Sequence, residues 1–466
     1  MNLEKCPPRA ICVLVWFAII LATASTASAS WKEKVLYSFQ GGTDGIRPVG
    51  GVIRDSQGNL YGATIGGGND NCSPMAACGT VYQLAPQKDG SWTETVLYVF
   101  KGKAFNDGEY PEGGVIADSA GNLYGTAAYG GSGDCVLLGI KGGCGVVYEM
   151  SPPEQRGGTW TETILYSFKG GKDGYVPQGN LVFDSAGNLY GATLFGGGKG
   201  TTCDPYYQYC GTVFELSPPK TKGGKWTEKV LHSFAGVATG QDSGDGANPN
   251  GTLVLDSKGA VYGTTYYGGN NQKGTCEGGA WGTGCGIVFK LTPPSREGGE
   301  WKENAIHRFD GEDGDNPTAG VVFGEDGDLY CTTYAGGGGR FPSGSAVQLV
   351  PEANGTWTRH TLHSFQDNGD GGIPQSGLTF DSKGNLYGTA SEGGTVGGGT
   401  LFRLRPTGDS WSFTTLYDFM GPPDGSYPSG NLIFDTSGNL YGTTQYSGTG
   451  QACGNYGCGT VFKAGP

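Results

Sequence analysis

Residues 177–193 read PQGNLVFDSAGNLYGAT, and residues 428–444 read PSGNLIFDTSGNLYGTT. Each stretch holds two apolar segments, rich in β-branched and aromatic residues, on either side of an Asp-x-x-Gly-Asn link. In such a link the Asp can bond its own turn and the Gly supplies a positive φ, as in a tight hairpin. The two segments are therefore predicted to be neighbouring antiparallel strands.

The hairpin belongs to a larger unit that recurs seven times along the chain. In one unit, the segment WTETILYSF (160–168) comes before the hairpin and the segment GTVFELSP (211–218) follows it. The repeats start near residues 31, 91, 159, 225, 300, 356 and 410. Four antiparallel strands per unit and seven units predict an all-β fold, a seven-bladed β-propeller with four-stranded blades.

The two ends of the repeat region indicate how the ring closes. The region starts with a Trp-initiated segment at 31–39 and finishes with GTVFKAGP at 459–466, which is a fourth segment. If the proline-led segment is the innermost strand, the Trp-initiated one is the outermost. We therefore expect the strand at 31–39 to complete the last blade, which removes the open edges of a linear array.

The first 29 residues are predicted to be a signal peptide. Lys5 and Arg9 precede an apolar run, and Ala27-Ser28-Ala29 resembles a cleavage signal. The run is too short for a membrane span. Residues 30–466 would form a single propeller, a monomer that is secreted, periplasmic or on the cell surface. Cleavage would move the net charge from −13 to −14, which argues against nucleic acid as a partner.

The cysteines of the repeat region fall into close pairs within one type of loop. Each pair lies between the third and fourth segments of a unit, and an oxidising compartment would allow it to form a disulfide. Zinc is the alternative, but it needs four converging ligands, and these pairs are distributed around the ring. The expected disulfides are Cys72–Cys78, Cys135–Cys144, Cys203–Cys210, Cys276–Cys285 and Cys453–Cys458. Cys331 remains as a buried, unreactive thiol.

Residues suited to catalysis or metal binding follow the repeat and are interpreted as structural. His232, His307 and His363 occupy a column that other units fill with Tyr. An Asp recurs in the Asp-Gly stretch before each inner strand. We interpret it as a turn residue, although seven carboxylates on one rim leave calcium as an alternative. The inner strands start at Gly50, Gly113, Gly179, Gly251, Ala319, Ser376 and Gly430, and neither this column nor the next carries an acid. We expect no catalytic residues, no metal and no cofactor.

Aromatic residues gather on the loop rim, just after the third segment of several units. Such rings suit stacking on sugars or capture of a protein, although packing between blades is an alternative for each. The candidate ligand-binding residues are Tyr129, Phe195, Tyr266, Tyr267, Trp281, Tyr334 and Tyr446. The longest loops lie in units two to four, so we expect the contact surface over that arc.

The order of these motifs resembles NHL-type propeller repeats. The fuller pattern, with LYSF before the hairpin and a Gly-rich stretch after LYGTT, resembles the GloVer tandem repeat of exported bacterial proteins. The resemblance implies export and a propeller-like fold, and it carries no established catalytic residues. The function expected is therefore non-enzymatic binding of an extracellular glycan or protein. The alternative is a propeller enzyme acting on extracellular polysaccharide, a lyase or a glycosidase.

Overall fold

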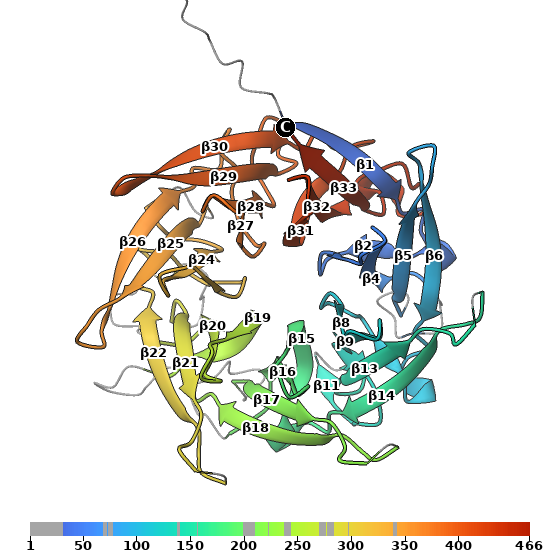
Figure 1. The fold of residues 1–466 in the computed structure, drawn as a ribbon, viewed down its shortest axis with the longest axis horizontal. Coiled ribbons are helices and arrows are strands. Elements are labelled where there is room, and N and C mark those ends of the chain that lie inside the picture. The colour runs from blue at the N-terminus through green and yellow to red at the C-terminus, as the bar shows by residue number, and fades with distance from the viewer. Residues whose placement is uncertain are drawn as a thin grey trace, which may run out of the picture. The chain divides into compact units, whose positions relative to one another are not determined.

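The computed structural model describes residues 31–68, 72, 78–137, 140–155, 157–198, 210–221, 223–236, 244–269, 276, 284–296, 298–338 and 343–466. The predicted signal peptide lies outside these residues. Trp31–Pro466 form one compact unit. Seven antiparallel sheets surround its central axis as blades (Figure 1), which confirms the predicted seven-bladed β-propeller. No helix of the described residues is long and apolar enough to cross a membrane.

Each blade has four strand positions, from the ring centre outward. Innermost are β2 (Ile46–Pro48) with β3 (Ile53–Arg54), β8 (Ile116–Ala117), β15 (Tyr175–Phe183), β19 (Ala247–Leu255), β23 (Val322–Phe323), β27 (Thr379–Phe380) and β31 (Ser426–Phe434). Second are β4 (Leu60–Gly66), β9 (Leu123–Ala127), β16 (Leu189–Phe195), β20 (Val261–Tyr267), β24 (Leu329–Thr333), β28 (Leu386–Ala390) and β32 (Leu440–Tyr446).

The outer half of each blade repeats in the same way. Third are β5 (Thr80–Pro86), β13 (Val146–Ser151), β17 (Thr212–Ser217), β21 (Ile287–Thr292), β25 (Ser345–Pro351), β29 (Thr400–Thr407) and β33 (Thr460–Gly465). Outermost are β6 (Trp92–Val99), β14 (Thr161–Ser167), β18 (Thr227–Ser233), β22 (Lys302–Arg308), β26 (Trp357–Ser364), β30 (Ser410–Asp418) and β1 (Lys32–Ser38). The loops add β7 (Gly108–Glu109), β10 (Tyr129–Gly130), β11 (Val136–Leu137), β12 (Ile140–Lys141) and the short 3-10 turns η1 (Gly42–Asp44), η2 (Lys103–Phe105), η3 (Gly171–Asp173) and η4 (Gly454–Tyr456).

The ring closes where the first strand of the propeller pairs with the last. β1 lies antiparallel to β33, from Lys32 opposite Gly465 to Ser38 opposite Thr460. The last blade therefore has the order β1-β33-β32-β31, as expected from the two ends of the repeat region. At the ring centre, Gly51 forms a bridge with Asn431 of that blade.

Neighbouring blades are joined by a backbone clasp that recurs around the ring. The residue before each inner-strand proline has a φ of 56–58°. Its N–H donates to a carbonyl at the end of the previous blade's third-to-fourth-segment loop, at 2.6–3.0 Å. The donor–acceptor pairs are Arg47–Cys458, Tyr110–Cys78, Val176–Cys144, Asn248–Cys210, Asn316–Cys285, Ile373–Ser343 and Tyr427–Gly398. A left-handed conformation is costly for a residue with a side chain, so the clasp helps to hold it.

The disulfides lie at these clasps. Cys72–Cys78, Cys135–Cys144, Cys276–Cys285 and Cys453–Cys458 are bonded as predicted. Cys210 is also in a disulfide, while its predicted partner Cys203 lies outside the described residues. In each of these loops the second cysteine supplies the clasp carbonyl. The disulfide thus fixes the loop at the point where it joins the next blade.

Cys331 has a packing explanation that the sequence pattern alone did not reveal. Other blades have Gly in its column, and at Gly191 an added Cβ would lie 2.5 Å from Cζ of Phe214 on the paired strand. Such aromatic cover of a strand glycine is a known way to pack a sheet. Opposite Cys331 stands Val347, a smaller residue, so there is room for the thiol. Cys331 is buried, and burial raises the pKa of its thiol to about 12.

Alkylation mapping tests these assignments. We expect Cys331 to resist a thiol reagent in the native mature protein and to be the one thiol labelled after denaturation without reductant. The disulfide-linked peptides should contain only pairs within one loop. A peptide that joins cysteines of two different loops would contradict the assignment.

Candidate functional site

Because the strands of a blade alternate in direction, the connections between them alternate between the two faces of the ring. The hairpin turns and the connections between third and outermost strands lie on one face. The long loops and the links from one blade to the next lie on the other, which we call the loop face. The described large apolar side chains that are exposed all belong to the loop face: Phe105, Val136, Val396, Met420, Tyr427 and Tyr456. Exposed apolar groups collected on one face are typical of a binding surface.

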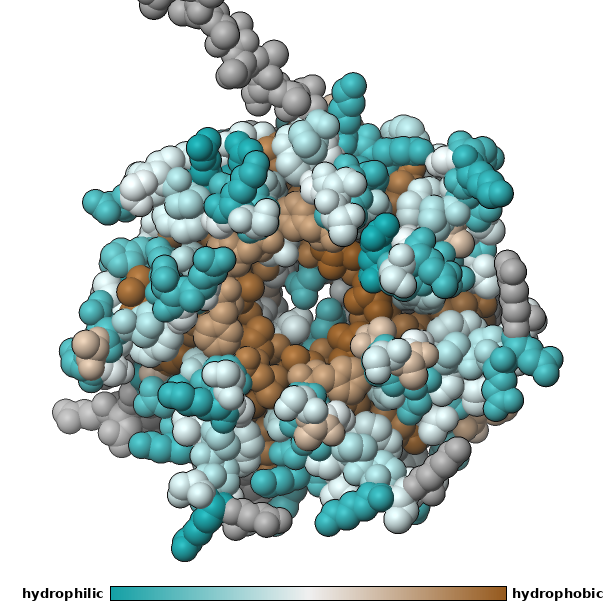
Figure 2. Space-filling model, in the orientation of Figure 1, coloured by the Kyte–Doolittle hydropathy of each residue, from teal (hydrophilic) through white to brown (hydrophobic). Residues whose placement is uncertain are grey.

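A cavity of about 390 Å³ lies at the ring centre, lined by residues from all seven blades. Figure 2 shows the ring centre hollowed, with apolar residues gathered around the opening. The inner strands run away from the loop face, so their first residues line the end of the cavity that opens there. Amides are the commonest type among its polar side chains: Gln178, Asn180, Asn250, Gln375, Asn431 and Gln445.

The floor of the cavity is built by close backbone packing between blades. A Cβ added at Gly179 would lie 2.4 Å from the carbonyl oxygen of Gly251 in the next blade, so this position requires glycine. At this depth the Asn431 side chain donates to Thr252 Oγ1, 3.2 Å away in another blade. Asn180 Oδ1 accepts from the Gly114 N–H at 2.6 Å. The first two residues of each inner strand, such as Gly179 and Asn180, thus narrow the cavity at its floor.

One cation and one carboxylate line the cavity on adjacent blades. Arg47 has an Nη2 atom 3.5 Å from Gln445 Oε1, and its Nε is buried without a hydrogen-bond partner among the described residues. The Gln178 amide donates to Glu112. Burial raises the pKa of Glu112 to about 7, and the Arg47 charge partly opposes that rise. These charges break the sevenfold pattern of an otherwise uncharged lining.

Sequence reasoning missed Glu112 and Arg47 because it considered neither the residue directly after the inner-strand proline nor the one directly before it. The acid-free columns begin two residues after each inner-strand proline, whereas the cavity is also lined by the residue directly after it. That column reads Val49, Glu112, Gln178, Asn250, Thr318, Gln375 and Ser429. A column with one acid and several amides was a visible signal. The sequence alone did not show that this position faces the ring centre.

The candidate aromatic residues lie in two columns with different surroundings. Tyr266 and Tyr334 line the cavity, with ring centroids 6.3 Å apart. The others come one residue later in their strands. Tyr129 and Phe195 pack against one core cluster and Tyr267 against another. Tyr446 contacts the rings of Tyr427 and Tyr456. Trp281 lies outside the described residues.

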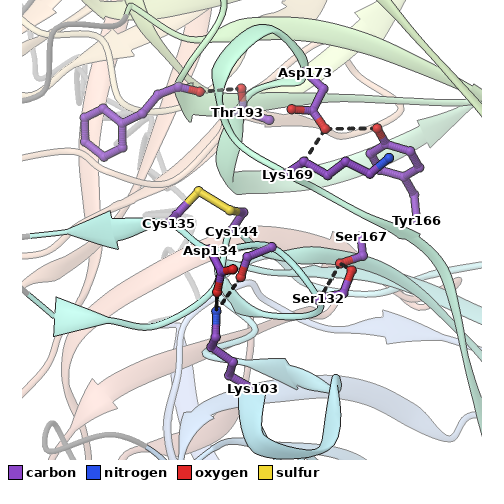
Figure 3. The surroundings of a disulfide bond; sticks show 12 residues. Lys103, Ser132, Asp134, Cys135, Cys144, Tyr166, Ser167, Lys169, Asp173 and Thr193 are labelled. Atoms are coloured by element: carbon purple, nitrogen blue, oxygen red, sulfur yellow. Dashed lines mark hydrogen bonds and ion pairs between the residues drawn. A yellow bond between two sulfur atoms is a disulfide. The ribbon is translucent and has the colours of Figure 1, made fainter.

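The Asp and His columns are tied into the blade links. Asp173 accepts hydrogen bonds from the Tyr166 hydroxyl and the Lys169 N–H, both at 3.0 Å, beside the Cys135–Cys144 disulfide (Figure 3). In three blades a His replaces the Tyr: His232–Asp245, His307–Asp313 and His363–Asp370, at 2.8–3.0 Å. In each of these blades the Asp therefore ties its blade link to the preceding outermost strand, as expected of a turn residue.

Asp315 is placed beside a disulfide rather than beside free thiols. A carboxylate oxygen of Asp315 and the sulfurs of Cys276 and Cys285 lie within 4.8 Å of one another. The two sulfurs are bonded to each other, so they are not thiolate ligands.

Seven blades around a polar cavity define this chain as a β-propeller with a candidate binding site at its axis. Residues 274–466 match the model of the Gloeobacter/Verrucomicrobia repeat. This part of the chain is similar to that repeat and contains the LYGTT motif at 440–444, in agreement with the resemblance noted in the sequence. No curated protein is significantly similar in sequence to the chain.

Solved structures of distant proteins share some of this arrangement. A putative oxidoreductase (glucose dehydrogenase) from Thermus thermophilus is 16% identical, with 75% of this chain and 95% of that one covered and a TM-score of 0.41. A protein of unknown function from Dyadobacter fermentans is 12% identical, with 94% and 98% covered and a TM-score of 0.43. A luciferin-regenerating enzyme is 13% identical, with 76% and 90% covered and a TM-score of 0.40. Likeness at this level carries no inference about the activity of this chain.

Proposed function

We propose that the protein is an exported binding propeller that holds an extracellular carbohydrate in the central cavity. The carbohydrate would enter the cavity from the loop face. The observation that carries this proposal is the lining itself: amides from several blades, one carboxylate, one guanidinium and two tyrosines. Export is supported by the predicted signal peptide and by the disulfides, which persist in oxidising compartments.

The lining chemistry matches sugar hydroxyl groups. A hydroxyl both donates and accepts hydrogen bonds, and an amide side chain offers both partners. Glu112 adds a strong acceptor and Arg47 a fork of donors, while a tyrosine ring offers a face for the C–H surface of a sugar. The single positive and single negative charge favour an uncharged sugar over a polyanion.

Replacement of Glu112 tests the proposed site. With the mature chain at pH 8, where the carboxyl group of Glu112 is mostly ionised, we expect a glycan array to give a neutral carbohydrate ligand, and Glu112→Gln to weaken its binding about tenfold, because a charge-assisted hydrogen bond is lost. Isothermal titration calorimetry measures the change. The control is Glu154→Gln, an exposed carboxylate on the opposite face, which should bind as the original protein does.

Two results would contradict the proposal. Binding that is unchanged in Glu112→Gln would place the site elsewhere, and capture of a protein without any carbohydrate would favour the protein-binding alternative. The enzymatic alternative needs its own assay, the release of reducing ends or unsaturated products from any polysaccharide that binds. A glycosidase commonly uses two carboxylates, and Glu112 is the one carboxylate in the lining of the cavity. Turnover that is abolished by Glu112→Gln would favour a lyase or glycosidase with this carboxylate at its centre.

A further inference from the structure

Three tyrosines of the last blade form a continuous path from the cavity to the outside. Gln445 lines the cavity and Tyr446 follows it at the end of β32. The ring of Tyr446 lies 5.3 Å from that of Tyr427 and 6.1 Å from that of Tyr456, measured between centroids. Tyr456 is 74% exposed and Tyr427 37% exposed. We call these three residues the tyrosine platform.

The exposed end of the platform is held in place by its loop. Tyr456 ends η4, inside the loop closed by the Cys453–Cys458 disulfide. Its carbonyl accepts a hydrogen bond from the Ser447 N–H at 2.6 Å, and Ser447 directly follows Tyr446. A Cβ added at Gly457 would lie 2.3 Å from the Ser447 oxygen, so the two segments are in close contact. A backbone that is held before binding loses less entropy when a ligand stacks on its side chain.

Arg47 joins the platform to the cavity. Its guanidinium lies over the Tyr446 ring, 5.3 Å from the centroid, while its Nη2 atom reaches Gln445. The same side chain therefore contacts the cavity lining and the first ring of the platform. A sugar bound at Gln445 has its next hydrogen-bond donor in Arg47, and the rings of Tyr446 and Tyr456 lie beyond the guanidinium.

Two other blades carry a ring pair at the equivalent positions. Blade two has Tyr110 and Tyr129, at 5.7 Å. Blade three pairs Tyr175, which is buried, with Phe195. In the last blade a third ring, Tyr456, continues the pair into solvent.

We infer that the tyrosine platform is a second subsite, which binds further sugar units of an oligosaccharide whose end lies in the central cavity. The inference rests on the proposed carbohydrate function and names its ligand class as an oligosaccharide rather than a monosaccharide. Aromatic faces in sequence suit a chain of sugar rings, because each ring presents an apolar C–H face.

Length-dependent binding tests the platform. The probes are ladders of one to six units of β-1,4-linked glucose, mannose, xylose and N-acetylglucosamine, titrated into the mature protein by calorimetry. We expect affinity to rise with length for the ladder that binds. In Tyr456→Ala the gain from the longer members should fall about tenfold, while the shortest binding member keeps its affinity. Tyr456 is exposed, so the melting temperature should not change.

The control and the outcomes separate the platform from the cavity. Phe105→Ala removes another exposed ring of the loop face, in η2 of the link between the first and second blades, and should leave the length dependence intact. If Tyr456→Ala keeps the full gain with length, the platform is not a subsite, although the cavity proposal stands. If no ladder and no arrayed glycan binds the original protein, the carbohydrate function itself is wrong.

Discussion

Removal of residues 31–39 is expected to lower the melting temperature of the propeller by roughly 10 °C or more and to cause aggregation. β1 covers β33 along six paired residues, and Phe39, directly after β1, is fully buried. The Phe39 ring contacts Tyr82 of the first blade at 5.0 Å, so the strand also joins the first and last blades. Burial of a Phe side chain alone contributes about 1.5–3 kcal/mol to the free energy of folding.

The deletion is compared with the mature chain that starts at residue 30. Differential scanning calorimetry measures the melting temperature, and size-exclusion chromatography measures aggregation. Lys32→Ala changes an exposed residue of the same strand and serves as the control. A synthetic peptide of residues 31–39, added to the truncated protein, should restore part of the lost stability. A truncated protein that stays monomeric with its melting temperature unchanged would mean that β1 does not stabilise the ring.

The second large effect expected is a loss of stability as the pH rises from about 5 to about 8. Five glutamates of the outermost strands occupy one column, each partly buried and close to a link aspartate: Glu33, Glu94, Glu162, Glu228 and Glu303. Burial is the main cause that raises the pKa values of Glu33 and Glu162 to about 8 and those of the other three to about 7. The nearby aspartate, for example Asp424 beside Glu33, adds to the rise.

The sign follows from which form the folded state prefers. A raised carboxyl pKa means that the folded protein binds a proton that the unfolded chain releases near pH 4.5. The stabilisation is therefore complete below about pH 4.5 and is lost as the pH rises through 7 to 8. His363 acts in the opposite direction at acid pH, because its burial lowers its pKa and disfavours the charged form. The stabilisation of the protein by the Asp313 carboxylate is also lost in acid. Burial alone would raise the pKa of Asp313, but its hydrogen bond with His307 and its other contacts outweigh burial and lower the pKa.

The structure provides an internal comparison for this column. In β26 the position is Arg359, whose Nε lies 3.5 Å from Asp313. In β30 it is Phe413, which stacks on His363 with centroids 3.8 Å apart. These two positions bring no second carboxyl group to the link aspartate, so the pH effect should come from the five glutamates.

Thermal melts between pH 5 and pH 9 test the prediction. We expect the melting temperature to fall by roughly 5 °C or more from pH 6 to pH 9. The variant with all five glutamates changed to Gln should lose most of that fall, because its amides do not titrate. Glu300→Gln, at an exposed position, is the control and should keep the full pH dependence. A melting temperature that is flat with pH in the original protein would show that the carboxyl pairs do not control stability.

The sequence alone determined the fold of this protein because the information is local and repeated. The Asp-x-x-Gly-Asn link requires a hairpin, and in the structure Asp184 accepts hydrogen bonds from the N–H groups of Ala186 and Asn188. Seven copies of that unit leave few arrangements other than a ring. The disulfide pairs could be assigned for the same reason, because each pair lies within one short loop.

Only the tertiary structure decided the surroundings of equivalent residues in different blades, and therefore which of them belong to a binding site. Glu112 and Arg47 are far from Gln445 in the sequence, and only closure of the ring brings them to one cavity. Tyr267 and Tyr446 hold equivalent positions in their strands, yet one packs on a core cluster and the other starts an exposed platform. Whether a side chain faces the axis, the neighbouring blade or solvent depends on contacts between blades. Those contacts join residues that are far apart in the chain, such as Asn431 and Thr252, and no local pattern encodes them.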